Sequence, residues 1–163
     1  MIKVAILTAS DKGSRGERQD SSAQVIRELI AKIGCQVVAY DVVPDEREIL
    51  AKKLVQYADQ DRVDLVLTCG GTGLSPRDVT PEATMDVADR LIPGIAEAMR
   101  VKGLEKTIRA MLSRAVAASR GGTLIINLPG SPRAVRENLE VVLPAIPHAL
   151  EVLQGAGGEC GRQ

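Results

Sequence analysis

Aromatic residues are nearly absent from this sequence, which has two tyrosines and neither phenylalanine nor tryptophan. Proteins that bind single-stranded nucleic acid commonly stack its bases on aromatic side chains, so this shortage argues against such a function. A net charge is also lacking, because 21 basic residues balance 21 acidic ones. A neutral chain produces no long-range field that would attract nucleic acid or an anionic membrane surface. We therefore expect neither nucleic acid nor a membrane among its partners.

Cysteine is scarce as well. The three cysteines, Cys35, Cys69 and Cys160, have the spacing of neither a disulfide framework nor a metal site, which fits a reducing compartment. The first apolar stretch is too short for a signal peptide, and no window reaches the apolar length of a membrane span. These features predict a soluble, cytoplasmic protein.

The rest of the composition is that of a globular protein. Of 163 residues, 45% are apolar and 26% are charged, which is enough to build a core and to keep its surface hydrated. The length fits one domain and no linker divides the chain, so residues 1–154 are expected to form a single domain. The segment 155–163 has four glycines in nine residues and is expected to be a flexible tail.

Short apolar runs that stop at glycine, serine, proline or aspartate predict buried parallel strands. These runs cover residues 3–9, 35–43, 63–69 and 123–128. Apolar positions spaced at about 3.6 residues per turn predict helices between them. The helices are expected at 22–33 and 45–58, from Pro81 with Thr80 as its cap, from near Pro93, and at 132–154 with interruptions near Pro144 and Pro147. This alternation predicts an α/β fold with three α/β/α layers and a mostly parallel sheet.

A small antiparallel hairpin is expected beside the last strand. Gly121-Gly122 precedes the run 123–128 and is typical of a tight turn, so residues 114–119 are interpreted as the first strand of the hairpin. In a hairpin the start of the first strand lies beside the end of the second. Ser113 and Asn127 are therefore expected at the same edge of the sheet.

Ligands of open α/β sheets bind beyond the carboxyl ends of the strands, so the loops that follow the strands form the candidate site. These loops carry glycines, hydroxyls and acids rather than apolar side chains. The candidates are Ser10, Asp11 and Asp20 after the first strand, Asp45 after the second, Gly70, Gly71, Thr72, Gly73 and Asp78 after the third, and Pro129, Gly130 and Ser131 after the fourth. Ser113 and Asn127 of the hairpin complete the set.

The run Gly70-Gly71-Thr72-Gly73 has two interpretations. Glycines let successive backbone N–H groups approach a phosphate and form an anion-binding nest. A tight strand-to-helix turn needs the same residues for its backbone angles alone. The run lacks the Gly-Lys-Ser/Thr ending of a P-loop and does not follow the first strand, as a dinucleotide fingerprint would. Spacing leaves both interpretations open.

Asp45 and Asp78 each lie at or just before an expected helix start. An acid in that position can cap the free N–H groups of the helix. Two acids on separate loops at one sheet edge also suit Mg²⁺, which takes one or two carboxylates together with substrate phosphates and water. Neither role excludes the other.

General-base and triad chemistry lack a candidate residue. His148 is the only histidine and lies far along the chain from every loop, so we interpret it as structural. Cys69 is interpreted as part of an apolar strand end rather than as a nucleophile. Arginines in the loops are solvated by default, although a ligand with phosphates would use one or two of them. They are Arg15, Arg18, Arg77 and Arg133.

These residues resemble the MogA/MoaB family of molybdenum cofactor biosynthesis proteins, which includes the G domain of gephyrin. The most specific motif is Thr-Cys-Gly-Gly-Thr-Gly-Leu-Ser-Pro-Arg-Asp-Val-Thr-Pro-Glu-Ala-Thr at 68–84. Further matches follow in the same order along nearly the whole chain. They are Ser10-Asp11 to Asp20-Ser21, Val43-Pro44-Asp45-Glu46, Pro93-Gly94, Met111-Leu112-Ser113-Arg114 and Ile126-Asn127-Leu128-Pro129-Gly130-Ser131-Pro132.

The resemblance implies the molybdopterin-binding, MogA-like fold, usually as a homotrimer, and a late step of cofactor assembly. In that step ATP adenylylates molybdopterin in a Mg²⁺-dependent reaction that gives adenylyl-molybdopterin and pyrophosphate. The family's functional acids, which would hold the metal, fall on Asp45 and Asp78, and its pterin-side residues fall on Ser113 and Asn127. Its nucleotide loop falls on residues 70–73. A molybdate-inserting protein is an implied partner.

Two rival functions remain beside this enzyme. One is a non-catalytic molybdopterin-binding or carrier protein of the MoaB type. Inactive members depart from the motif at the acids, whereas this sequence keeps Pro44-Asp45-Glu46 and Arg77-Asp78-Val79-Thr80, which favours the adenylyltransferase. The other rival is an unrelated α/β protein that binds NAD or flavin, and the position of the glycine run counts against it.

Overall fold

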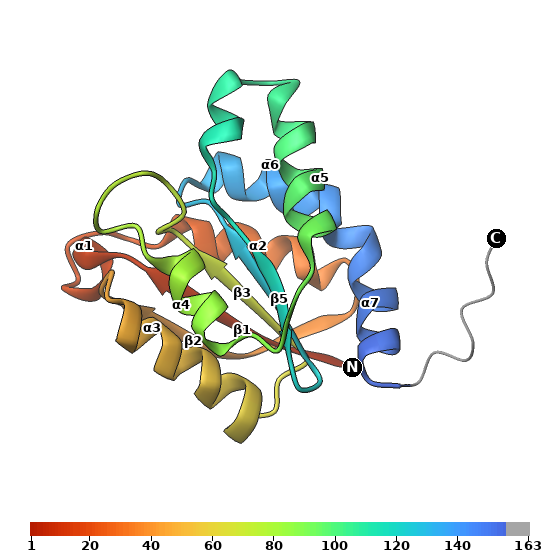
Figure 1. Cartoon of the computed structure of the whole chain (residues 1–163). Helices are drawn as coiled ribbons and strands as arrows, with labels where there is room; N and C mark the ends of the chain where they lie inside the picture. The colour runs from red at the N-terminus through yellow and green to blue at the C-terminus, as the bar shows by residue number, and fades with distance from the viewer. Residues whose placement is uncertain (156–163) are drawn as a thin grey trace.

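The computed structural model describes residues 1–155, and Figure 1 shows a central sheet with helices on both of its faces. The sheet has six strands in the order β2-β1-β3-β6-β5-β4. Their bounds are Ile2–Ala9 for β1, Cys35–Val43 for β2, Leu65–Cys69 for β3, Arg90–Leu91 for β4, Ala117–Arg120 for β5 and Thr123–Leu128 for β6. β2, β1, β3 and β6 pair in parallel, whereas the β6–β5 and β5–β4 pairs are antiparallel.

Two apolar clusters fill the space between the sheet and its helices. On one face lie α2 (Ser21–Ala31), α5 (Pro93–Leu104), α6 (Pro132–Val142) and α7 (Ile146–Leu153). On the other face lie α3 (Arg47–Val55), the π-helical turn η1 (Gln56–Gln60) and α4 (Thr80–Val87). The predicted α/β/α layers and mostly parallel sheet are thus confirmed.

The central strands β1, β3 and β6 are mostly apolar because both faces of the sheet are covered. Successive residues of β1 point to opposite faces, as in any strand. Val4 and Ile6 belong to the cluster under α2 and α6, and Ala5 and Leu7 belong to the cluster under α3 and α4. Burial on both faces is what turns an alternating pattern into the continuous apolar run seen in the sequence.

The predicted elements are confirmed in kind, with some shifted ends. β2 and β6 have the predicted bounds, and β3 begins at Leu65 rather than at 63. The expectation that the strand 35–43 is buried is wrong, because β2 lies at the edge of the sheet and alternates between half-buried and exposed residues. The long last helix is interrupted as expected, because α6 stops at Val142 and the 3₁₀ turn η3 (Leu143–Ala145) accommodates Pro144 before α7. Three short elements were not predicted because they lack a periodic apolar pattern. They are α1 (Asp11–Ser14), β4 and the 3₁₀ turn η2 (Ile108–Leu112).

The hairpin is confirmed, but its first strand begins at Ala117 rather than at 114. The difference arises at Arg114, whose backbone N–H donates to the carbonyl oxygen of Thr72 at 2.9 Å instead of to a neighbouring strand. The segment before β5 therefore belongs to the loop region at the carboxyl edge of the sheet.

The expected cap of α4 is wrong. Val79 occupies the N-cap position, and Thr80 is the first helical residue. The Thr80 hydroxyl donates instead to the carbonyl oxygen of Gly70 at 3.0 Å, so it ties the start of α4 to the end of β3.

Two further expectations concern the C-terminal tail and membrane-spanning helices. The flexible tail predicted for 155–163 lies, apart from Gly155, outside the described residues. Across residues 1–155, no helix is long and apolar enough to cross a membrane.

The strand order creates a crevice between β1 and β3. β1 pairs with β2 on one side and with β3 on the other. The chain therefore runs from β1 to its neighbour β2 and then crosses back past β1 to form β3. Thr8 pairs with Cys69, which places the loops after these two strands side by side. Such a switch point at the carboxyl ends of the strands is where open α/β sheets bind ligands.

Candidate functional site

A cleft of about 440 Å³ opens at this switch point. Its walls come from the ends of β1 and β3, the segment 18–22 that leads into α2, and the turn 130–132 that leads into α6. The candidate residues that line it are Ser10, Asp20, Gly70, Gly130 and Ser131, whereas Pro129 is not among the lining residues. The structure therefore brings three of the predicted loops into a single cavity.

Two helices begin at this cleft with polar caps. Asp20 Oδ1 accepts the Ala23 N–H at 3.0 Å at the start of α2. Ser131 Oγ accepts the Ala134 N–H at 3.2 Å at the start of α6. The amino end of a helix carries a partial positive charge, so the two helix starts favour an anionic group in the cleft.

Asp20 is already engaged within the protein. Its second carboxylate oxygen, Oδ2, accepts hydrogen bonds from the Thr8 hydroxyl at 2.5 Å and from the Tyr40 hydroxyl at 2.7 Å. Burial and this carboxylate raise the pKa of Tyr40, which keeps the phenol protonated as a donor. Asp20 therefore shapes the wall of the cleft, and a direct contact between Asp20 and a ligand remains a prediction.

One loop arginine differs from the other three. Arg18 lines the cleft and forms no hydrogen bond or ion pair within residues 1–155. The other three each pair with a carboxylate: Arg15 with Glu17, Arg77 with Asp11, and Arg133 with Glu137. Arg18 is therefore the loop arginine that an incoming phosphate would meet without a competing carboxylate.

The backbone conformation and close packing of the glycine run at 70–73 require glycine at two positions. Gly70 and Gly71 have φ angles of +89° and +69°, a region that other residues rarely adopt. A Cβ on Gly70 would overlap the carbonyl oxygen of Ala9, and a Cβ on Gly71 would overlap the hydroxyl of Thr80. These contacts support the tight-turn interpretation, and the phosphate nest remains a prediction.

Asp11 and Asp45 join the first two loops through reciprocal hydrogen bonds. The Asp11 N–H donates to Asp45 Oδ2, and the Asp45 N–H donates to Asp11 Oδ1, each at 3.0 Å. Arg77, from the loop after β3, donates to the two oxygens of Asp11 at 3.1 and 2.8 Å. Three loops are therefore cross-linked at the carboxyl edge of the sheet.

The two carboxylates of this pair differ in their titration. Hydrogen bonds from Arg77 hold the pKa of Asp11 below its ordinary value. Burial raises the pKa of Asp45, and the negative charges of Asp11 and Asp78 raise it further. Asp45 is thus a half-buried acid repelled by its neighbours, and a bound cation would relieve that repulsion.

Asp78 approaches from the loop between β3 and α4. Its Oδ2 accepts the Ser75 N–H at 3.0 Å, and it lies so close to Gly73 that a Cβ there would be 2.8 Å from the same oxygen. The capping role that the sequence allowed for Asp45 and Asp78 is wrong. The N-cap residues of α3 and α4 are Glu46 and Val79, and neither Asp45 nor Asp78 accepts a hydrogen bond from the first turn of α3 or α4.

The candidate metal donors at this edge are the carboxylates of Asp45 and Asp78. Within residues 1–155, no three histidine, cysteine, aspartate or glutamate side chains gather as a complete metal site. Asp45 and Asp78 are hard oxygen donors on separate loops, and Asp78 is close enough to raise the pKa of Asp45. That set fits Mg²⁺, because this ion completes its coordination with water and substrate phosphates.

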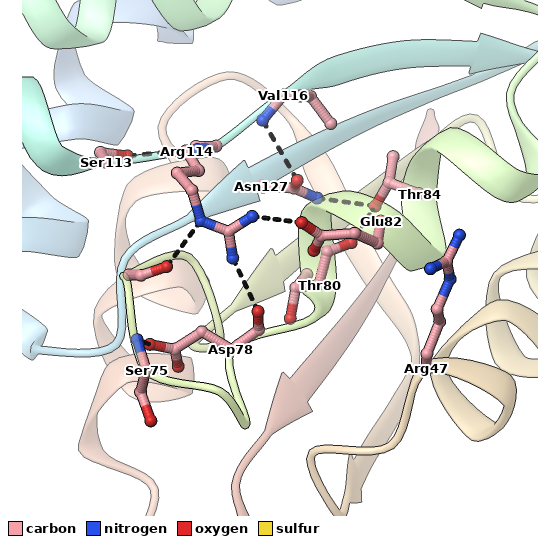
Figure 2. A network of polar contacts seen from close by, with 12 residues as sticks. Arg47, Ser75, Asp78, Thr80, Glu82, Thr84, Ser113, Arg114, Val116 and Asn127 are labelled. Carbon is pink, nitrogen blue, oxygen red and sulfur yellow. Dashed lines mark hydrogen bonds and ion pairs between the residues drawn. The ribbon is translucent and has the colours of Figure 1, made fainter.

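Asn127 lies on β6 opposite Thr68 of β3 and is fully buried. Its Oδ1 accepts the Val116 N–H at 3.2 Å, and its Nδ2 donates to the hydroxyls of Thr68 and Thr84 at 3.0 and 2.9 Å, as Figure 2 shows in part. The side chain ties β6 to β3, α4 and the hairpin. A contact between Asn127 and a pterin would require these partners to move, so it remains a prediction.

Ser113 lies at the end of η2, at the same edge as Asn127, as the hairpin geometry predicted. It is half-buried, and its hydroxyl accepts the Ala115 N–H at 3.3 Å. Between Ser113 and Val116 the chain presents Arg114, which sequence reasoning did not assign a role. The sequence offered two signals for Arg114, the family match Met111-Leu112-Ser113-Arg114 and its place as a single cation between Met111 and β5, and neither indicates its partners.

Neither Cys69 nor His148 is placed to act as a nucleophile or a general base in the site. Cys69 is buried beside the Thr8 hydroxyl, 3.1 Å away, and burial raises the pKa of its thiol to about 12, so it is not a thiolate at neutral pH. His148 is exposed on α7, with Nδ1 3.6 Å from Glu151, and it does not line the cleft.

Comparison with known proteins identifies the class. A family model described as a probable molybdopterin binding domain matches residues 5–148. Because this match spans most of the chain, the chain belongs to that family of molybdopterin-binding domains. Its relatives include a MogA protein and a MoaB protein described as a molybdopterin biosynthesis enzyme.

Three relatives show how far the similarity extends. A molybdopterin adenylyltransferase of Helicobacter pylori (strain J99) is 42% identical over 156 residues, which cover 94% of this chain and 89% of that protein. Gephyrin of Dictyostelium discoideum is 44% identical over 160 residues, which cover 92% of this chain and 22% of gephyrin. The solved structure of the molybdopterin biosynthesis enzyme MoaB of Thermus thermophilus is 57% identical with a TM-score of 0.91, and the match covers 95% of this chain and 98% of that one.

Proposed function

We propose that this chain is a molybdopterin adenylyltransferase of molybdenum cofactor biosynthesis. It transfers the adenylyl group of ATP to molybdopterin and releases pyrophosphate. The observation that carries the proposal is the placement of Asp45 and Asp78 on separate loops at the carboxyl edge of the sheet. Burial raises the pKa of Asp45, and the charges of Asp11 and Asp78 add to that effect, so the two loops bring their acids near each other. The 42% identity to an adenylyltransferase over 94% of the chain supports the same reaction.

The reaction requires little acid–base help from the protein. An oxygen of the terminal phosphate of molybdopterin attacks the α-phosphorus of ATP, and the bond from that phosphorus to the bridging oxygen breaks as pyrophosphate leaves. A phosphate monoester is already ionised at neutral pH, so no general base is needed to activate it. The protein's task is to position two anionic substrates and to offset their charge. This task fits a site without an ionised thiol or an imidazole.

Mg²⁺ fits the donors at this edge. Asp45 and Asp78 would hold it, directly or through water. When bound, the ion supplies charge neutralisation at the phosphates and at the leaving pyrophosphate. The carboxylates contribute the negative charge that draws the cation to the site, and the reciprocal hydrogen bonds between Asp11 and Asp45 keep the Asp45 carboxylate in a fixed orientation.

The cleft at the ends of β1 and β3, which neither Asp45 nor Asp78 lines, is suited to a phosphate group. The starts of α2 and α6 open into it, and Arg18 lines it without a partner among the described residues. The assignment of the glycine run to nucleotide phosphates and of Ser113 to the pterin substrate belongs to the same proposal. Both assignments come from the family motif.

The wider context of the enzyme is also proposed by analogy with the family. We infer a cytoplasmic homotrimer that passes its product to a molybdate-inserting protein. Large apolar side chains are exposed on α5 and η2, which project from the body of the molecule in Figure 1 and offer a surface for subunit contact. They are Val101, Leu104, Ile108, Met111 and Leu112. Light scattering is expected to give about three times the chain mass, and a monomer at micromolar concentration would contradict the assembly.

A molybdopterin carrier without turnover is the second candidate, because the 57% identical structure is that of a MoaB protein. The two functions differ in one product. Purified chain, ATP, Mg²⁺ and molybdopterin are incubated together, and pyrophosphate is measured with time. An enzyme releases pyrophosphate only when both substrates are present, whereas a carrier binds molybdopterin and releases none.

A further inference from the structure

Arg114 holds the loop that carries Asp78. Its Nε donates to the carbonyl oxygen of Gly73 at 2.7 Å, and its Nη2 donates to the carbonyl oxygen of Asp78 at 2.7 Å. Its Nη1 pairs with Glu82 on α4. Figure 2 shows this guanidinium at the centre of the network, with the loop on one side and α4 on the other. One planar group therefore fixes both ends of the segment 73–78.

The segment between these two ends has few other anchors. Residues 74–77 are exposed. Two of its hydrogen bonds are internal, from the Asp78 N–H to the Ser75 carbonyl at 2.9 Å and from the Ser75 N–H to Asp78 Oδ2 at 3.0 Å. Within residues 1–155, its only other side-chain bond to the rest of the protein is that of Arg77 with Asp11. The position of the Asp78 backbone therefore depends on the guanidinium that binds its carbonyl oxygen.

Glu82 keeps Arg114 in place. One of its oxygens pairs with Arg114, while the other, Oε2, is buried without a hydrogen-bond partner among the described residues. Leaving a carboxylate oxygen unpaired is costly, and the arrangement persists only because the arginine compensates the charge. Glu82 belongs to the first turn of α4. Arg114 is therefore anchored to a helix rather than to another loop.

We propose that Arg114 is a positioning residue for adenylyl transfer. Arg114 holds the Asp78 carboxylate in a position from which Asp78 and Asp45 can bind one cation together with its phosphates. The proposal rests on the function proposed above, but its structural part, that Arg114 holds the segment 73–78 in place, can be tested without turnover. Nothing in the geometry requires Arg114 to touch a substrate.

Arg120 provides a matched control. It also donates three hydrogen bonds, one to the Val87 carbonyl at 2.8 Å and two to the Asp59 carboxylate at 3.0 and 2.7 Å. Arg114 thus braces the start of α4 and Arg120 braces its end. The two arginines have the same number of side-chain bonds and contact the same helix, but only Arg114 contacts the segment 73–78.

The experiment compares Arg114→Gln, Arg114→Lys and Arg120→Gln in the full chain. Hydrogen exchange of the peptide that covers 73–78 is measured in each variant without ligands. Arg114→Gln is expected to raise the exchange rate of this peptide about tenfold or more, because the segment opens once its two carbonyl contacts are lost. Arg120→Gln is expected to leave that peptide unchanged. Equal protection of the segment in Arg114→Gln and the wild type would overturn the proposal.

Turnover supplies the second readout. Arg114→Gln is expected to lower kcat for pyrophosphate release about 10- to 100-fold and to raise the Mg²⁺ concentration at half-maximal rate, with a smaller change in KM for molybdopterin. Arg114→Lys is expected to recover part of the loss, because an ammonium can reach one carbonyl but cannot fork to two. A kcat and Mg²⁺ dependence equal to those of Arg120→Gln would contradict a positioning role.

The outcomes remain distinguishable if the proposed function itself fails. A wild-type chain that releases no pyrophosphate removes the adenylyl-transfer assignment, and binding of Mn²⁺ in the presence of ATP, measured by electron paramagnetic resonance, then replaces turnover. Weaker Mn²⁺ binding in Arg114→Gln than in Arg120→Gln supports the positioning role of Arg114. Equal binding in both variants overturns it. If Arg114→Gln does not fold, Arg114→Lys is judged by the same exchange and metal-binding criteria.

Discussion

The two ends of the sheet are both polar, but their polar groups are satisfied to different degrees. At the amino end, Asp64 accepts the Lys3 N–H and the Gln154 amide, each at 2.7 Å. At the carboxyl end, burial and neighbouring acids raise the pKa of Asp45, and Arg18 has no partner within residues 1–155. Polar groups paired within the chain hold a fold together, whereas groups left repelled or unpaired can be completed by a ligand. Polarity alone does not distinguish Asp64 from Asp45, but the extent to which hydrogen bonds within the chain satisfy the carboxylate does.

The sharpest test of this contrast exchanges one acid at each end for its amide. Asp78→Asn is expected to keep the fold, because an asparagine oxygen can still accept the Ser75 N–H. It is expected to lose most adenylyl transfer, by about 100-fold or more, because the amide lacks the charge that draws the metal to the phosphates. The rate of pyrophosphate release measures the effect.

Asp64→Asn is the control at the amino end. It is expected to leave the rate unchanged and to lower stability by about 1 kcal/mol, since it weakens two internal hydrogen bonds. Near wild-type turnover in folded Asp78→Asn would remove the metal role. Equal losses of activity in the two variants would remove the distinction between the ends.

A smaller effect is expected from adding one methyl group to a glycine at each end. Gly71→Ala places a Cβ on the Thr80 hydroxyl in a backbone with φ of +69°. It should lower stability by about 2 kcal/mol and weaken nucleotide binding about tenfold by displacing the loop beside Asp45. Calorimetric titration with ATP and a thermal melt measure the two effects.

Gly121→Ala is the corresponding control in the hairpin turn. Its φ is +52°, but a Cβ there would meet nothing within 4 Å. It should cost about 1 kcal/mol of stability from the backbone angle alone and leave ATP affinity unchanged. Unchanged ATP affinity in folded Gly71→Ala would leave the glycine run with a purely structural role.

The pattern of apolar runs and turn residues was enough to predict the layers, the four parallel strands and the hairpin. Burial on both faces leaves a clear signature, as in β1, where every residue from Val4 to Leu7 is excluded from solvent. Strand order cannot be read in this way, yet the carboxyl edge of the sheet could be predicted because parallel strands end on the same side. The loops with Asp45 and Asp78 followed from that rule.

Side-chain pairing was beyond the reach of the sequence. The acids were expected to be possible helix caps, and the structure instead shows Asp45 bonded to the Asp11 N–H and Asp78 to the Ser75 N–H. Arg114 is part of the family match Met111-Leu112-Ser113-Arg114, but that motif does not indicate the three groups distant in sequence that converge on it. Loop backbones bring such partners together, and no local rule connects residues more than thirty positions apart.

A modest effect is expected from the unpaired cation of the cleft. Arg18→Gln should raise KM for the substrate whose phosphate enters the cleft about two- to fivefold, because Arg18 is exposed and solvent screens its charge. The effect should weaken at high ionic strength. Arg15→Gln removes an arginine that already pairs with Glu17 and should leave both KM values unchanged. Equal KM values in the two variants would show that pairing does not decide which loop arginine contacts substrate.

The smallest effect concerns the stability of the chain without ligands. Because burial and like charges raise the pKa of Asp45 above 3.8, the folded state binds a proton more tightly there than the unfolded state does. This carboxyl therefore makes stability fall as pH rises from 3.8 through its raised pKa, and the resulting penalty persists at neutral pH. Asp11 contributes with the opposite sign, because Arg77 lowers its pKa.

The difference between the wild type and Asp45→Asn isolates the contribution of Asp45. The amide can still accept the Asp11 N–H but carries no charge, so the variant should melt at a slightly higher temperature than the wild type at pH 7. The gain should disappear below pH 3.8, where the wild-type carboxyl is protonated in both states. Adding Mg²⁺ with ATP should stabilise the wild type more than the variant, because ligands that bind the folded state raise its stability. A lower melting temperature for Asp45→Asn at pH 7 would mean that the charge of Asp45 is satisfied within the chain, as that of Asp64 is, and the contrast between the two ends would not hold at this residue.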